Sequence, residues 1–381
     1  MTCPIKKLLL IGAGHAHAFV LEAFAQQPDS NIAITVVSDS PLAAYSGSVP
    51  AWLAGECTLR ETQIDVAALC QRANALLILS PAKAINLQSR CVELADGECI
   101  DFDVASFNIG STLTLPEQHG EQLPHLLAMR PLSSLHYRWQ ALQETVNALP
   151  PGGDLRVVSV GGGAASCETL MSVLAQLRHQ RPDIDWQGHL LSASNELLPG
   201  AGRLPRWLMR HALLRAGINV FQQIRGAALV DGGVLTHCNV LMRADIVLWA
   251  TGAVGHRWLS ETALPLNDQG FIQVEKSLQV VGQPVIFAAG DCAAFDPPLP
   301  NAGVYAVRMG PHLADNLRRA CCGESLADWQ PPKRVLALIG TGDGHAIASR
   351  GSFGVSGKWV WEWKKRIDAR FIARFNPPFE G

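Results

Sequence analysis

Two glycine-rich turns, each between an apolar run and a helical pattern, constrain the fold of this chain more than any other feature. The first follows Ile5–Ile11 and consists of Gly12-Ala13-Gly14; the second follows Leu155–Val160 and consists of Gly161-Gly162-Gly163. An uninterrupted apolar run predicts a strand that is covered on both faces, as in a parallel sheet. A further strand follows each helical pattern, so we predict two β-loop-α-β units.

A glycine-rich turn between a strand and a helix is typical of a phosphate-binding site. The first glycine permits the tight turn, the second lets the backbone approach a pyrophosphate, and the helix N-terminus attracts negative charge. We therefore predict that Gly12 and Gly14 contact one nucleotide, and that Gly161 and Gly163 contact another.

The third glycine of the full G-x-G-x-x-G pattern is missing from both units. It normally lets the helix pack close to the strand. Ser166 replaces it in the second unit, which is a small change, and His17 replaces it in the first. We expect His17 to be a packed core residue; the alternative is that its ring lies close to bound cofactor.

A carboxylate after the second strand of such a unit usually binds the ribose 2′-hydroxyl. In the first unit, Asp39 follows the predicted strand Ile32–Val37 and is the candidate. In the second unit, Ser192–Asn195 offers no carboxylate, and no arginine for a 2′-phosphate comes before Arg203. The residues therefore support the second nucleotide less strongly than the first.

Apolar periodicity predicts the other regular elements. Helices are expected over residues 15–26, from 164 to 180 and over 302–320, and strands over 102–110, 188–191, 245–251 and 285–290. Pro150-Pro151-Gly152-Gly153 is predicted to link the two units.

Composition excludes several classes of protein. The 381 residues carry a formal net charge of −2, so there is no overall basic field for nucleic acid. No apolar run reaches the roughly 18 residues of a membrane span. Ten cysteines without a C-x-x-C pair predict reduced thiols in a cytoplasmic protein, and no metal site is predicted. An alternative interpretation of residues 1–18 is a secretory signal peptide, since two lysines precede an apolar run and an A-x-A pattern.

The motifs in their order (G-x-G, D-x-x-x-x-x-x-G, G-G-G-x-x-x-x-E, A-T-G and G-D) resemble FAD-dependent pyridine nucleotide oxidoreductases with two dinucleotide-binding domains. Within these, the chain looks most like the type II NADH dehydrogenases, and closer still to the branch fused to, or encoded near, selenide, water dikinase. The segments that resemble this branch are His15–His17, Tyr45–Pro50, Asn301–Arg308 and Thr341–Gly344. The resemblance implies an α/β fold with two Rossmann-like domains, like that of glutathione reductase. It argues against the signal peptide, because cleavage would remove the first strand and its turn.

The resemblance implies roles for residues around FAD. Gly12 and Gly14 would contact its pyrophosphate, and Asp291, after Gly290, would accept a hydrogen bond from the ribityl chain. A helix starting near Ala302 would direct its N-terminus at the flavin's N1–O2 edge, where reduced flavin is negative. The other residues expected to contact cofactor are His15, Gly110 and Gly252.

For NAD(P)H, the resemblance implies that Gly161 and Gly163 contact the pyrophosphate. It places Glu168 near the nicotinamide; the alternative is a solvated helix charge.

The implied enzyme passes electrons from NAD(P)H through FAD to a quinone or another small acceptor. No catalytic side chain is required, because the flavin carries the chemistry. Tyr305 and Arg308 are candidates for contact with the acceptor. Ala302-Gly303 replaces an Ala-Gln pair that faces the quinone in type II NADH dehydrogenases, which weighs against a quinone.

Two other functions are also considered. One is sulfur or selenium redox chemistry like that of sulfide:quinone oxidoreductases, for which Cys167 is the suggestive thiol; a small buried residue is its plainer interpretation. Disulfide reductases carry a cysteine pair early in the chain, where this chain has only Cys57, so a dithiol relay is not expected. The other is an FAD-binding sensor or partner that has lost NAD(P)H binding. The branch also implies a functional link to selenophosphate synthesis.

The predicted domains are an FAD-binding domain (residues 1–115 and 265–325), an NAD(P)H-binding domain (150–264) and a C-terminal region (326–381). Within the last, residues 358–375 carry six basic and two acidic side chains, a local charge of +4. Apolar residues recur there every four positions: Trp359, Trp363, Ile367, Phe371 and Phe375. We expect a basic amphipathic helix that either docks on the protein or contacts the inner face of the membrane.

Overall fold

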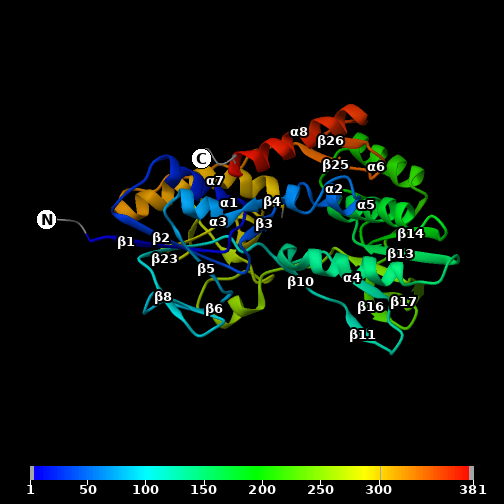
Figure 1. Cartoon of the computed structure of the whole chain (residues 1–381), viewed down its shortest axis with the longest axis horizontal. Coiled ribbons are helices and arrows are strands. Elements are labelled where there is room, and N and C mark those ends of the chain that lie inside the picture. Colours follow the sequence, from blue (N-terminus) through cyan, green and yellow to red (C-terminus); the bar gives the residue numbers. More distant parts are fainter. Residues whose placement is uncertain (1–3, 301, 377–381) are drawn as a thin grey trace.

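The computed structural model describes residues 4–300 and 302–376, so Asn301 of the motif above lies outside the described residues. A six-stranded sheet in the order β22-β23-β9-β1-β2-β5 forms one half of the molecule (Figure 1). All neighbours are parallel except β22 and β23. The bounds are β1 Lys6–Ile11, β2 Ile32–Ser38, β5 Leu76–Leu79, β9 Val104–Phe107, β22 Gln279–Val280 and β23 Gln283–Ala288.

Three helices pack against one face of this sheet: α1 (His15–Gln26), α3 (Val66–Arg72) and α7 (Gly303–Cys322). Leu8 and Leu10 of β1 point into the core that these helices share, whereas Leu9 and Ile11 belong to the core on the other face. The strand β1 is therefore buried on both faces, as its uninterrupted apolar run predicts.

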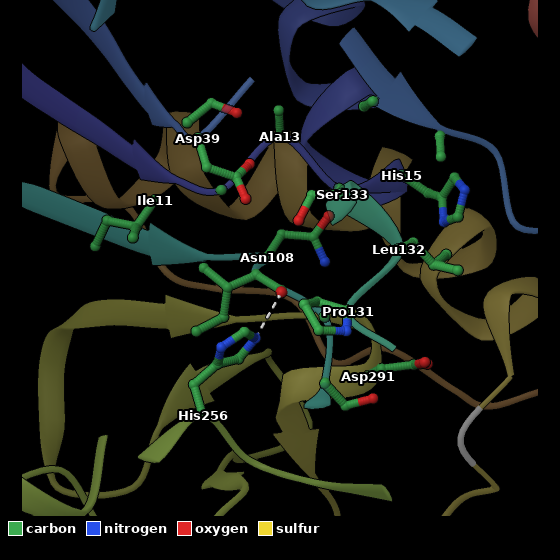
Figure 2. Close-up of a pocket in the computed structure, with 18 of the residues that line it drawn as sticks. Ile11, Ala13, His15, Asp39, Asn108, Pro131, Leu132, Ser133, His256 and Asp291 are labelled. Carbon is green, nitrogen blue, oxygen red and sulfur yellow. Dashed lines mark hydrogen bonds between the residues drawn. The ribbon is translucent and has the colours of Figure 1, made fainter. Parts of the chain in front are cut away.

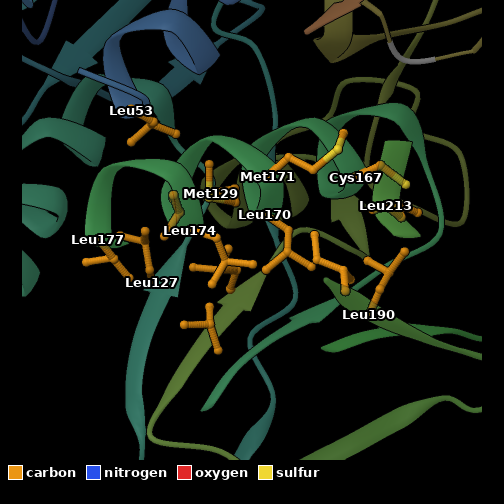
Figure 3. Close-up of a cluster of buried hydrophobic side chains, with 14 of the residues drawn as sticks. Leu53, Leu127, Met129, Cys167, Leu170, Met171, Leu174, Leu177, Leu190 and Leu213 are labelled. Atoms are coloured by element: carbon orange, nitrogen blue, oxygen red, sulfur yellow. The ribbon is translucent and has the colours of Figure 1, made fainter. Parts of the chain in front are cut away.

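A second, all-parallel sheet forms the other half, in the order β12-β19-β13-β14-β15. Its strands are β12 His125–Ala128, β13 Asp154–Val160, β14 Asp185–Ser192, β15 Ile218–Gln222 and β19 Ile246–Trp249. One face packs on α4 (Leu135–Asn147), α5 (Ala164–Gln180) and α6 (Arg203–Arg215). Figure 3 shows this core, with Leu170, Leu174 and Leu177 of α5 directed at the sheet. The predicted α/β class with two Rossmann-like sheets is confirmed.

The second sheet begins earlier in the chain than the predicted domain boundary. Strand β12 and helix α4, which precede residue 150, pair and pack with it. The predicted linker Pro150–Gly153 is therefore wrong: it is a turn inside this half, between α4 and β13, and the Gly152 N–H is bound by Asp183. We propose that the second domain starts near residue 117.

Smaller sheets complete the two halves. One packs beside the second sheet: β11 Glu117–His119, β16 Gly226–Val230, β17 Gly233–Thr236 and β18 Leu241–Arg243. Another packs beside the first: β6 Ala82–Asn86, β7 Cys91–Leu94 and β8 Cys99–Asp101. The chain crosses between the halves as the antiparallel pair β10 (Thr112–Leu113) and β20 (Ala253–Val254). The remaining short elements are β3 Leu42–Ala44, α2 Val49–Leu53, η1 Arg60–Thr62, β4 Gln63–Asp65, η2 Leu132–Ser134, η3 Arg257–Glu261, β21 Ile272–Gln273, η4 Gly290–Cys292 and β24 Ala293–Ala294.

The C-terminal region joins both halves. Its antiparallel strands β25 (Ala337–Gly340), β26 (Ala346–Arg350) and β27 (Phe353–Gly357) were not predicted. Ile339 and Ile347 enter the core of the second half. Helix α8 (Lys358–Phe375) then runs back along the molecule, and Phe375 is fully buried in the core of the first half.

Helix α8 divides the predicted apolar stripe between two environments. Trp359, Trp363 and Ile367 are exposed, whereas Phe371 is half-buried and Phe375 buried. The reason is geometric: residues four apart on a helix are rotated by about 40°, so the first and last residues of this stripe differ by about 160°. The C-terminal turns therefore dock on the protein, as one of the two interpretations predicts. Within the described residues, no helix is both long and apolar enough to span a bilayer.

Candidate cofactor-binding site

A cavity of about 450 Å³ opens at the carboxyl ends of β1, β2 and β9 (Figure 2). Its wall contains six of the residues predicted to contact FAD: Gly12, Gly14, His15, Asp39, Gly110 and Asp291. Parallel strands end together at one edge of a sheet, which explains why residues so distant in the chain meet here.

The first glycine turn fits a nucleotide phosphate. Gly12 has a φ of +84°, which favours glycine. A Cβ on Gly14 would lie 2.4 Å from Oδ1 of Asn108. That same oxygen accepts hydrogen bonds from the N–H groups of Ala16 (2.9 Å) and His17 (3.3 Å) in the first turn of α1. Asn108, which the sequence analysis missed, thus holds the turn and the helix in place while the glycines keep the surface free of side chains.

Asp291 is held by an arginine that the sequence analysis also missed. Nη1 of Arg130 lies 2.7 Å from Oδ2 of Asp291, and the same nitrogen donates to the Ser111 hydroxyl. Both charged residues line the cavity. The two residues are 161 positions apart, so no local pattern connects them.

His15 lines the cavity as a neutral imidazole. Burial lowers its pKa to about 4. The backbone N–H of Ser46 approaches Nε2 at 3.4 Å, which assigns the ring proton to Nδ1. Its ring meets Tyr45 edge-on at 5.3 Å between centroids, and Tyr45 stacks on Phe371 of α8 at 4.2 Å.

His17 lies in the core, as expected. It is fully buried, Nδ1 lies 2.5 Å from the Gly12 carbonyl oxygen, and Nε2 lies 2.9 Å from the Ser106 hydroxyl. Burial lowers the pKa of His17 to about 4, so the ring is neutral. It fills the space between helix and sheet that a glycine would leave.

The second glycine turn has the same construction. Gly161 has a φ of +136°, and a Cβ there would lie 2.3 Å from the hydroxyl of Ser166, the residue that replaces the third glycine. A Cβ on Gly163 would meet nothing within 4 Å, so this position faces open space at the start of α5. Gly252, with a φ of +73°, accepts the Thr114 N–H where the crossover strands begin.

Glu168 is engaged by the C-terminal region and is not a solvated helix charge. Oε1 accepts the Gly340 N–H at 2.6 Å. Burial raises the pKa of Glu168 to about 7, although the positive charge of Lys364 opposes the shift. Near neutral pH this carboxyl group can therefore gain or lose a proton.

Lys364 of α8 is the buried cation of this cluster. Its Nζ lies 2.8 Å from Oδ2 of Asp368 and donates to the Gly47 carbonyl. Burial disfavours its charge, but Glu168 and Asp368 outweigh this and raise the pKa of Lys364. Burial and Asp368 together raise the pKa of Tyr45. The cluster is next to the cavity wall in the chain, because Gly47, which Lys364 binds, directly follows the cavity-lining residue Ser46.

The three candidate catalytic residues, Cys167, Tyr305 and Arg308, are not among the cavity-lining residues. Cys167 is fully buried in the core of the second half, and burial raises the pKa of its thiol to about 12. Tyr305 packs at the edge of the other core, and Arg308 is exposed. Helix α7 is instead represented in the wall by Gly303 and Ala306, just after its N-cap residue Ala302.

Two relatives that align over nearly the whole chain are named type II NADH:quinone oxidoreductases. The chain is 23% identical to a type II NADH:quinone oxidoreductase of Staphylococcus epidermidis, over 97% of this chain and 96% of the relative. The counterpart from Staphylococcus aureus is 22% identical over the same shares.

Solved structures share the fold. The sulfide:quinone oxidoreductase of Aquifex aeolicus superposes with a TM-score of 0.77 at 16% identity, covering 98% of this chain and 94% of that one. NDH2 of Plasmodium falciparum, solved in complex with NADH, gives 0.75 at 12% identity and covers 98% of both chains.

The family model described as pyridine nucleotide-disulphide oxidoreductase matches residues 6–316, which is most of the chain. The match covers both glycine turns and the whole wall of the cavity. It confirms the predicted class, an oxidoreductase that uses flavin and a pyridine nucleotide. The chain therefore belongs to the pyridine nucleotide-disulphide oxidoreductase family.

Proposed function

We propose that this chain oxidises NADH through bound FAD and delivers the electrons to a quinone. The carrying observation is the single cavity that unites the turn Gly12–Gly14, Asp39 and Asp291. A phosphate turn and two acidic residues supply contacts for the pyrophosphate and the sugar hydroxyls of a dinucleotide. The full-length relatives named for NADH and quinone support the choice of donor and acceptor.

When bound, FAD supplies the redox chemistry by taking a hydride and giving up two electrons. The chain's residues bind and orient. Asp39 would hold the ribose, Asp291 would accept a ribityl hydroxyl with Arg130 fixing its carboxylate, and the start of α7 would face the developing negative charge. Gly161, Gly163 and Glu168 of the second half would hold NADH.

The polar contact for the acceptor would come from His15. Residue 303 is glycine where the type II enzymes carry glutamine, and a Cβ there would lie 2.7 Å from the Ser46 hydroxyl. His15 Nδ1 lies 4.0 Å from the same point. Its neutral ring, with the proton on Nδ1, can donate to a quinone carbonyl without a buried positive charge.

Sulfide or a selenium compound is the alternative donor, supported by the sulfide:quinone oxidoreductase fold match. Cys167 offers this function no support, because its thiol is buried and protonated. A sensor that has lost NADH binding is the third candidate.

Anaerobic stopped-flow absorbance at the flavin band tests these alternatives. NADH, NADPH and sulfide are mixed separately with the oxidised protein, and a water-soluble quinone is added afterwards. We expect fast bleaching by NADH and recovery with quinone. Bleaching by sulfide alone would favour the sulfur chemistry, and bleaching by none would favour the sensor. Gly161→Val should keep FAD and reduction by dithionite but lose fast reduction by NADH.

We also propose that the protein lies on the inner face of the membrane, where a quinone would be reached. The exposed residues Trp359, Trp363 and Ile367 of α8, together with the basic charge of that helix, support this contact. Sedimentation with anionic vesicles tests it, and failure of the protein to sediment would contradict it.

A functional link to selenophosphate synthesis is a more specific part of the proposal. It rests on the motif resemblance at Tyr45–Pro50 and Thr341–Gly344. Co-purification of the chain with selenide, water dikinase from cells expressing both would support it, and the absence of a complex together with unchanged selenophosphate yield would oppose it.

A further inference from the structure

Helix α6 exposes apolar and basic side chains together on the surface of the second half. Its exposed residues include Leu204, Trp207 and Leu214. Its sequence, RLPRWLMRHALLR, contains four arginines and no acidic residue. Among the tryptophans of the described residues, the exposed ones are Trp207 here and Trp359 and Trp363 on α8. Exposed apolar side chains that gather in a patch mark contact with a partner or a membrane.

The ends of α6 and α8 are joined through the C-terminal strands. The N–H of Gly202, the residue before α6, donates to the Gly351 carbonyl at 3.0 Å. A Cβ on Gly354 of β27 would lie 3.0 Å from Pro205 of α6. Phe353, the first residue of β27, is 61% exposed beside this contact. Figure 1 shows α6 and the start of α8 at the same end of the molecule, with β25 and β26 labelled between them.

The charges nearby remain basic after local pairing is counted. On α6, Arg206 pairs with Glu196 and Arg215 pairs with Asp343, which leaves a positive balance on that helix. On α8, Lys365 pairs with Glu362, while Lys358, Arg366 and Arg370 are exposed. Tryptophan beside arginine and lysine is the composition that favours the headgroup region of an anionic bilayer.

We propose that α6 is a second membrane-contact element, which together with Phe353 and the first turns of α8 binds an anionic lipid surface. This inference rests on the proposed membrane contact of α8 and extends the contact to α6 in the second half. Two contacts joined by the β25–β27 sheet would fix the orientation of the molecule on the bilayer, which one helix alone would not.

Vesicle sedimentation of the full-length holoprotein tests the proposal. The variants are Trp207→Ser/Leu214→Ser on α6, Trp359→Ser/Trp363→Ser on α8, and Tyr137→Ser as a matched control. Tyr137 is 67% exposed on α4, so it loses a similar aromatic surface in a different place. The vesicles are phosphatidylglycerol mixed with phosphatidylcholine, and phosphatidylcholine alone, at low and high salt.

We expect the wild type and Tyr137→Ser to bind the anionic vesicles equally and to be released by salt. Each double variant should bind about tenfold more weakly, equivalent to about 1.4 kcal/mol. Reduction of the flavin by NADH in solution should be unchanged in the α6 variant.

Three results would overturn the proposal in distinguishable ways. If the α6 variant binds at the wild-type level and only the α8 variant loses binding, α8 contacts the membrane and α6 does not. Failure of the wild type itself to bind would remove the membrane contact altogether. A concentration-dependent dimer in sedimentation velocity that is lost in the α6 variant would assign this face to a second copy of the chain.

Discussion

At the scale of single residues, the glycine turns work because of what packs against them. Asn108 lies so close to Gly14 that even one methyl group would collide with its side chain. We expect Gly14→Ala to abolish stoichiometric FAD binding, whereas Gly163→Ala, in open space at the equivalent turn, should retain about one FAD per chain. The measurement is the flavin absorbance released on denaturation. Full occupancy in Gly14→Ala would remove the turn from the site.

Glu168 should make stability depend on pH in an unusual direction. Because burial raises its pKa from 4.5 to about 7, the folded state holds a proton that the unfolded state releases between these values. The stability of the wild type relative to Glu168→Gln should therefore fall as pH rises through this window. Thermal melts across pH measure it, and Glu98→Gln, on the exposed β7–β8 turn, is the control. Parallel curves for wild type and Glu168→Gln would contradict the assignment.

Discrimination between NADH and NADPH should be modest. The Ser192 side chain is buried and donates to the Ser194 carbonyl, so it offers no carboxylate to a 2′-hydroxyl. Glu196, the next acid, is paired with Arg206 at 2.5 Å, which also occupies that arginine. The ratio of kcat/KM for the two nucleotides measures the effect. A preference above about 1000-fold, or about 4 kcal/mol, would mean that a recognition residue lies elsewhere.

At the scale of elements, the C-terminal turns of α8 are part of the first core. Phe375 is fully buried, its carbonyl accepts from Arg72, and Arg374 forms a two-point ion pair with Glu22 at 2.7 Å. Phe375→Ala should cost about 3–5 kcal/mol of unfolding free energy, the usual range for a buried phenylalanine. Phe353→Ala, at an exposed phenylalanine of the same region, should cost almost nothing. Urea titration of both variants measures the difference.

Elements with a strong local signal were predicted closely from the sequence. The helix expected at 15–26 is α1, and the apolar run ending at Ile11 is β1. Failures occurred where the deciding contact is distant in the chain. The turn at Pro150–Gly153 has the composition of a linker, but β12 pairs with β19 across more than a hundred residues and encloses it. The drift of the α8 stripe followed from helix geometry, yet which end would be buried depended on the core it meets.

The site shows the same division. The glycines and Asp291 can be predicted from sequence motifs, because a tight turn and a close approach of the backbone to a ligand permit few residue types. Asn108, Arg130 and Lys364 carry no motif, because each binds partners that lie far away in the chain. The burial of Lys364 could not be predicted for a further reason. In the sequence it is one of several basic residues on a helix expected to face solvent, and only the negative charges of Glu168 and Asp368 stabilise it in the interior.

At the scale of the whole molecule, the C-terminal region ties the two halves together. Strands β25 and β26 place Ile339 and Ile347 in the core around α5, and α8 ends with Phe375 in the core around α1. Between these anchors, Glu168 of the second half and Gly47 of the first half are both bound to this region. Neither half can lose its packing without disturbing the shared elements.

Thermal unfolding should therefore be a single transition that FAD shifts as a unit. A ligand at 100 times its Kd stabilises the folded state by about 2.7 kcal/mol. If both halves unfold together, added FAD should raise the melting temperature of the whole molecule. This includes the core around Trp186 in the second half, which does not line the FAD cavity. Scanning calorimetry at increasing FAD concentration measures this, with NADH alone as a comparison.

Truncation after Gly357 should separate the melt into two transitions, of which only the one belonging to the first half responds to FAD. Two transitions already present in the full-length protein would show that α8 and its sheet do not couple the halves.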